Sequence, residues 1–192
     1  MRNDKISNIA GVGLMIAIVI ILQYLGSFIK FGPFSISLVL VPIVVGACLY
    51  GPLAGAILGF IFGLIVLISG DAAAFLVIDV LGTIITVLLK GTLCGLFAGL
   101  VYKAFKKNKN IGAVCASIIA PITNTGIFLI CCLLFFMPTI TQWANAFGFD
   151  NVYSYMFLGL VGANFLFELL VNMILSPVII RLIKIGEYRN RK

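Results

Sequence analysis

Long apolar stretches alternate with short polar stretches along the whole chain. About 20 apolar residues in a helix cross the hydrocarbon core of a bilayer, which is about 30 Å thick, and most stretches here are of that order. The pattern predicts an all-α integral membrane protein, a six-transmembrane-helix bundle in a single domain over residues 1–192. The expected helices cover roughly residues 9–28, 35–50, 53–69, 79–105, 111–137 and 154–184.

Some segments depart from this simple alternation. Gly51 and Pro52 predict a tight turn between the second and third stretches, which are both short for a full crossing. Residues 70–78 are too few to span, so we expect them to lie at the interface or dip back toward the bundle. The first stretch has a basic start like a signal peptide, but no small-residue cleavage site follows, and we expect it to be retained.

The amino-acid composition is that of a protein whose surface is mainly in contact with lipid. Hydrophobic residues make up 62% of the chain and charged residues only 10%, which is too little polar surface to coat a soluble particle of this size. The five cysteines are scattered within apolar segments, and the chain has no histidine to complete a metal site. We therefore expect neither a metal nor another cofactor.

Positive charges orient the expected helices. Lys and Arg residues are retained on the cytoplasmic side during insertion. If the odd-numbered helices run outward, both chain ends are cytoplasmic, and only Lys30 and Lys90 lie elsewhere. The net charge of +7 is then a topology signal, and there is no basic domain to bind nucleic acid. The cytoplasmic basic residues are Arg2, Lys5, Lys103, Lys106, Lys107, Lys109, Arg181, Lys184, Arg189, Arg191 and Lys192.

Glycines recur at helix period in the third and fourth expected helices. Small residues four apart let two helix backbones approach closely inside a bilayer. We expect these helices to be central or tightly paired, and a sliding face between subunits is the alternative interpretation. The glycines are Gly51, Gly55, Gly59 and Gly63, and then Gly91, Gly95 and Gly99.

A few polar residues lie inside the apolar stretches at similar depth. Lys90 and Glu168 are ionisable and lie about 16 to 20 Å from the outer ends of their helices. Asn164 and Asn172 lie one turn to either side of Glu168, and Asn124 reaches a similar depth in the fifth helix. An ionisable group at such depth is a functional candidate by default, because its burial in lipid is costly.

Two interpretations of this polar layer stay open. Lys90 and Glu168 could form a buried pair that, with the amides, holds the helices in register. Alternatively, the layer forms the floor of an outward-facing pocket for a small polar solute, with Lys90 meeting an anionic group. The two interpretations are compatible.

The outer loops supply candidate ligand contacts. Residues 27–35 alternate apolar and polar side chains around Gly32 and Pro33, which suits a strand or hairpin over the opening and includes Phe34. Residues 137–153 carry several aromatic side chains, among them Trp143. Aromatic residues at this level form either an interfacial belt or a stacking surface for a ligand.

Absent motifs argue against catalysis. The sequence has no P-loop, no histidine, no GxSG-type serine segment and no aspartate-rich metal motif. We therefore expect a protein that is not an enzyme and that does not itself use ATP.

Taken in order, several motifs resemble the substrate-binding S component of energy-coupling factor (ECF) transporters, importers of the ABC type that take up vitamins. The similarity covers nearly the whole chain, and the basic residues at both chain ends are part of it. Its markers are the segments at residues 41–46, 50–63 and 90–102, then Thr123-Asn124-Thr125, and then Asn164 and Glu168.

The resemblance implies a mechanism. S components bind substrate at the outer side and then topple within the membrane, driven by two partner ATPases through a membrane coupling subunit. That subunit grips small residues in the first helix, where this chain has Gly13 and Ala17 in place of the usual pair of alanines. Lys90 replaces the arginine found in many relatives, which keeps the charge but loses the bidentate geometry.

The resemblance also suggests a substrate and its contacts. The Thr-Asn-Thr segment and the spacing of Asn164 and Glu168 look most like the pantothenate group. Riboflavin, folate, pyridoxine and hydroxymethylpyrimidine are the alternatives. The expected substrate-binding residues are Lys90, Thr123, Asn124, Asn164, Glu168, Phe34 and Trp143.

Two rival functions do not need ATPase partners. A stand-alone secondary carrier or small channel would use Lys90 and Glu168 as an ion-coupling pair. A non-transporting assembly subunit would use the same charges only to hold helices together. Loss of uptake without loss of substrate binding, on substitution of Gly13 and Ala17 by bulky residues, would distinguish an S component from both.

Overall fold

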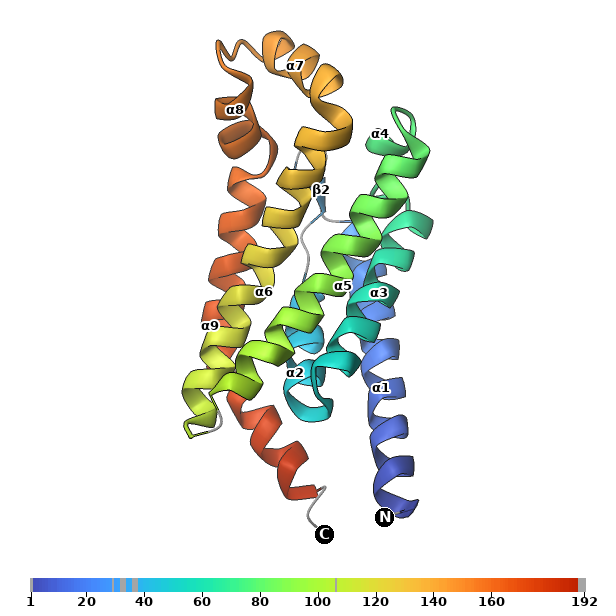
Figure 1. Ribbon diagram of the computed structural model, residues 1–192, viewed down its shortest axis with the longest axis vertical. Coiled ribbons are helices and arrows are strands. Elements are labelled where there is room, and N and C mark those ends of the chain that lie inside the picture. Colours follow the sequence, from blue (N-terminus) through green and yellow to red (C-terminus); the bar gives the residue numbers. More distant parts are fainter. Residues whose placement is uncertain (1, 29, 32–33, 36–37, 106, 190–192) are drawn as a thin grey trace.

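A computed structural model describes residues 2–28, 30–31, 34–35, 38–105 and 107–189, with side chains described for residues 8–28, 38–105 and 107–186. The described chain is almost entirely helical (Figure 1). The elements are α1 (Arg2–Ser27), β1 (Lys30–Phe31), β2 (Phe34–Ser35), α2 (Leu40–Tyr50), α3 (Pro52–Ile68), α4 (Ala73–Leu76), α5 (Val80–Ala104), α6 (Lys109–Cys131), the π-helical segment η1 (Cys132–Phe136), α7 (Met137–Ala146), α8 (Val152–Ser154), the π-helical segment η2 (Tyr155–Leu160) and α9 (Gly162–Arg189).

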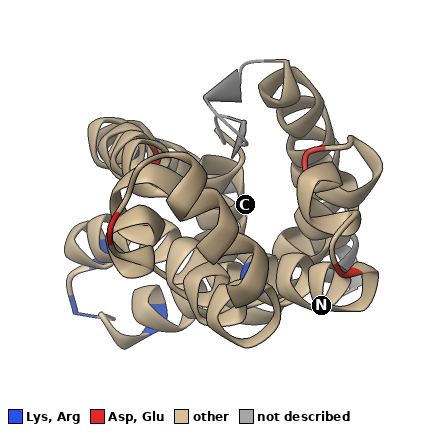
Figure 2. Cartoon of the chain, turned by 90° about the horizontal axis from the view of Figure 1, so that it is seen from above, with Lys and Arg blue, Asp and Glu red and all other residues tan. Residues whose placement is uncertain are grey.

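The helices confirm an all-α membrane protein. Among the described residues, four helical segments are long and apolar enough to cross a membrane, at residues 8–27, 80–104, 109–146 and 162–186. The apolar helices α2 and α3 are shorter, as expected from the sequence. Few of the described residues are charged (Figure 2), and many large apolar side chains are exposed on the helices.

The helices form one elongated bundle with a clear polarity. The two chain ends lie at one end of the bundle, and α4, α7 and α8 lie at the other (Figure 1). The extended structure expected within residues 27–35 is confirmed: β1 and β2 pair in antiparallel fashion, with Lys30 opposite Ser35 and Phe31 opposite Phe34.

The paired glycines lie between α3 and α5. Gly55, Gly59, Gly91 and Gly95 are all buried. A Cβ atom added to Gly59 would collide with the carbonyl oxygen of Gly91, and one added to Gly95 would collide with the carbonyl oxygen of Gly55. The two backbones therefore touch, which confirms internal packing and leaves no free surface for a sliding face at these positions.

Segment 70–78 lies at the end of the bundle (Figure 1), where only Ala72 and Phe75 of its residues are buried, so it does not dip between the helices. It contains the short helix α4, and Phe75 within it is only 5% exposed. Phe75 packs at the end of the bundle away from the termini, in an apolar cluster with Phe128, Phe136 and Ile140. A second apolar cluster joins α2, α3 and α5.

Candidate functional site

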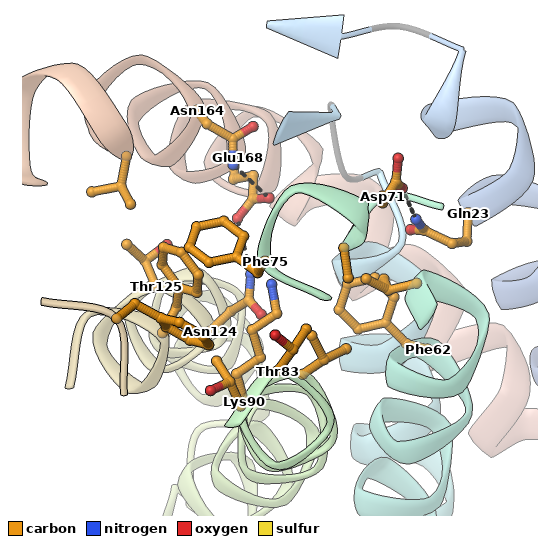
Figure 3. Close-up of a pocket in the computed structure, with 17 residues that line it drawn as sticks. Gln23, Phe62, Asp71, Phe75, Thr83, Lys90, Asn124, Thr125, Asn164 and Glu168 are labelled. Atoms are coloured by element: carbon orange, nitrogen blue, oxygen red, sulfur yellow. Dashed lines mark hydrogen bonds between the residues drawn. The ribbon is translucent and has the colours of Figure 1, made fainter. Parts of the chain in front are cut away.

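A pocket opens among α1, α3, α4, α5, α6, η1 and α9 (Figure 3). The space between its walls is about 740 Å³, including the part that is open to the surroundings. No lining residue comes from α2, the shortest of the apolar bundle helices.

Glu168 lies at the centre of the polar wall. Glu168 is 2% exposed, and its carboxylate accepts hydrogen bonds from the side-chain amides of Asn124 at 3.4 Å and Asn164 at 3.2 Å. Asn172, one turn further along α9, donates instead to the Glu168 backbone carbonyl at 2.8 Å. The layer expected from the sequence is thus confirmed as a cluster, while its role in binding stays a prediction.

Lys90 enters the pocket from α5, and its side chain points toward the region of Asn124 and Glu168 (Figure 3). Its Nζ atom lies 5.4 Å from the centroid of the Phe128 ring, in a cation–π contact. No salt bridge of 4.0 Å or less joins Lys90 to Glu168, both of which the structure describes. The first interpretation of the polar layer expected a buried Lys90–Glu168 pair together with amide hydrogen bonds. The amide hydrogen bonds are present, but the direct ion pair is not.

Two amide oxygens in the pocket wall are buried acceptors. Among the described residues, Asn124 and Asn164 each have a buried side-chain oxygen without a hydrogen-bond partner. Leaving a buried polar atom unsatisfied costs about 1–3 kcal/mol. A ligand that brings N–H or O–H groups to this wall would remove that cost.

Aromatic side chains complete the pocket. Phe75 makes edge-to-face contacts with Phe128 and Phe136, at centroid distances of 5.5 and 5.1 Å. Trp143 does not line the pocket and instead packs behind Phe75, at 5.6 Å. Trp143 therefore supports the wall, and Phe75 is the aromatic surface that a ligand would meet.

The remaining expected site residues lie in different places. Thr123 is buried and outside the pocket lining, whereas Thr125 is part of it. Phe34 lies in β2, but its side chain is outside the described residues. Gly13 and Ala17 are exposed on α1, and no atom lies within 4 Å of a Cβ added to Gly13.

The sequence interpretation missed several lining residues. Gln23 and Asp71 both line the pocket, and the Gln23 amide donates a hydrogen bond to the Asp71 carboxylate. A signal for Gln23 existed, because it is a polar residue within an apolar stretch. Thr83 and Thr86 also line the pocket, with their hydroxyls bonded to backbone carbonyls of the preceding turn.

Comparisons with known proteins agree with the resemblance. Residues 7–180 match the family described as "ECF transporter, substrate-specific component". The chain is 28% identical to the pantothenic acid transporter PanT of Lactococcus lactis subsp. cremoris (strain MG1363), over 94% of this chain and 95% of that protein. No solved structure matches the chain.

Proposed function

This chain belongs to the substrate-specific component family of ECF transporters, and we propose that it captures pantothenate at the outer face of the membrane. Its place in the family makes it a multi-pass protein of the bacterial cell membrane and the substrate-binding subunit of a vitamin transporter. The observation that carries the proposal is the ammonium group of Lys90, the one cationic side chain among the described lining residues, in the same pocket as the unsatisfied amide oxygens of Asn124 and Asn164.

The chemistry of pantothenate suits this arrangement. The molecule has a carboxylate at one end, an amide in the middle and two hydroxyls beside a dimethyl carbon at the other end. The carboxylate would meet Lys90, and the amide N–H or a hydroxyl would donate to the free oxygens of Asn124 and Asn164. Phe75 and Val87 would contact the apolar carbons. The similarity to a pantothenic acid transporter supports the same substrate.

The proposed topology has six spans with both ends in the cytoplasm. The two termini share one end of the bundle (Figure 1), and the described basic residues Lys103, Lys107 and Lys109 lie at the turn between α5 and α6, toward the same end. The pocket residues Asp71 and Phe75 belong to the opposite end, which would then face outward. With this topology, a solute entering from outside would reach Lys90 and Glu168 through the pocket.

The proposed partners are a membrane coupling subunit and two ATPase subunits. Gly13 and Ala17 leave a shallow strip on the exposed face of α1, beside Leu14, which is 55% exposed. Small residues of this kind accept a second helix at close range. Release of the substrate inside would follow from toppling of the bundle against this partner.

Identification of the bound ligand tests the proposal. The protein is purified in detergent, any retained small molecule is identified by mass spectrometry, and the dissociation constants of pantothenate, riboflavin, folate, pyridoxine and hydroxymethylpyrimidine are measured by calorimetry. We expect pantothenate to bind most tightly, and Lys90→Ala to weaken it at least tenfold, because the carboxylate loses the one cation among the described residues that line the pocket. Preference for another vitamin would refute the pantothenate assignment.

A further inference from the structure

The pocket has a second polar place, formed by Gln23 of α1 and Asp71 of the loop after α3. The two residues are 48 positions apart in sequence, and the amide of Gln23 donates to a carboxylate oxygen of Asp71. They lie across the pocket from Glu168 and Asn164, with Lys90 and Phe75 between the two walls (Figure 3). The carboxylates of Asp71 and Glu168 thus lie on two opposite walls of the pocket.

Gln23 is an unusual residue for its position. It is 2% exposed in a helix that is otherwise apolar around it, and it is the one α1 residue among those described as lining the pocket. Burying an amide is costly unless it is hydrogen-bonded, so a purely structural contact here would be served equally well by apolar packing. The Gln23–Asp71 pair instead borders the open space of the pocket.

We propose that Gln23 and Asp71 form a second subsite that recognises a hydroxyl group of the substrate. This inference rests on the proposed function, in which the substrate carboxylate meets Lys90. A carboxylate is a strong acceptor of a hydrogen bond from a hydroxyl group. It also repels the carboxylate of the substrate, which is attracted to Lys90. The two subsites together fix the orientation of a short hydroxylated carboxylate.

Removing a hydroxyl from the ligand and removing the Asp71 carboxylate from the protein together distinguish hydroxyl recognition from a purely structural role of Asp71. Dissociation constants are measured for the full chain in detergent, with pantothenate and with an analogue whose terminal hydroxymethyl group is methyl. We expect the wild type to bind the analogue about 10- to 100-fold more weakly, as for loss of a hydrogen bond to a charged group. The Asp71→Ala variant should bind both ligands with similar affinity, because the two changes remove the same interaction.

Two further variants control this comparison. Asp150→Ala removes the same charge from an exposed residue outside the pocket lining and should keep the discrimination of the wild type. Gln23→Leu removes one hydrogen-bond donor to Asp71 and should reduce the discrimination partly, because the carboxylate remains but loses the contribution of that donor. Gln23→Leu also serves if Asp71→Ala fails to fold. The subsite is refuted if the variants weaken both ligands by the same factor, which is the result for a structural brace.

A second pair of ligands tests the hydroxyl subsite independently of the proposal that pantothenate is the substrate. Riboflavin and lumiflavin, which lacks the hydroxylated side chain, are measured in parallel. A wild type that binds riboflavin but not pantothenate refutes the pantothenate assignment, and discrimination against lumiflavin that depends on Asp71 would still support the subsite. A wild type that discriminates within neither pair overturns the subsite.

Discussion

Substituting Gly59 by alanine tests how the glycine contact between α3 and α5 holds the pocket in shape. The added Cβ atom would collide with the carbonyl oxygen of Gly91 and lie 2.6 Å from its carbonyl carbon. Ordinary contacts between carbon atoms are about 3.5–4.0 Å, so the helices must separate locally by about 1 Å. A gap of that size loses about a quarter to a half of the dispersion energy along the contact.

The expected cost of Gly59→Ala is about 1–3 kcal/mol for overpacking, offset by about 0.5–1 kcal/mol gained when alanine replaces glycine in a helix. The matched control is Gly126→Ala in α6, where no atom lies within 4 Å of the added Cβ. This control keeps the gain without the collision. Thermal unfolding is followed in detergent through the fluorescence of Trp143, the single tryptophan of the chain.

We expect the melting temperature of Gly59→Ala to lie below that of Gly126→Ala by on the order of 5 °C. Binding should weaken as well, because Lys90 precedes Gly91 on α5 and Phe62 lies one turn beyond Gly59 on α3, and both line the pocket. If Gly59→Ala melts at the same temperature as Gly126→Ala, the backbone contact does not limit stability and this reasoning fails.

Four other substitutions, two of them also combined, test the remaining features. Lys90→Glu and Glu168→Lys should each abolish pantothenate binding, and the double reversal should not restore it, because no salt bridge joins the two residues; calorimetry showing full recovery would favour a structural pair. Gly13→Leu should leave the dissociation constant unchanged and abolish uptake into cells that contain the ECF partners, since its side chain would enter open space on α1; normal uptake would contradict the partner surface. Phe75→Ala should cost about 3–5 kcal/mol of stability and weaken ligand binding, since it removes the centre of the aromatic cluster; an unchanged melting temperature would show that the cluster is not cohesive.

The membrane-spanning elements could be predicted because their cause is local. A backbone in lipid must satisfy its own hydrogen bonds, so each long apolar stretch forms a helix whatever its neighbours are. Close packing of α3 and α5 could likewise be predicted from the spacing of Gly55, Gly59, Gly91 and Gly95, because only glycine leaves room for two backbones to touch. The depth of Lys90, Asn124 and Glu168 followed from counting residues along helices.

The composition of the pocket depended on contacts that no local pattern records. Trp143 was expected to meet a ligand, but the chain folds α4 between it and the pocket, and Phe75 takes that place. The helical turn carrying Thr123 and Thr125 was identified, yet only the rotation of α6 in the bundle determines that Thr125 lines the pocket.

The sequence by itself determined that this protein is a helical membrane protein with a small set of buried polar residues, because the cost of placing charge and bare backbone in lipid acts on each segment separately. Only the tertiary structure decided which polar groups meet. It joined Glu168 to amides rather than to Lys90, and it brought Gln23 and Asp71 together across 48 positions of sequence. Such pairings depend on the packing of whole helices against one another, which determines the two opposite polar walls of the pocket.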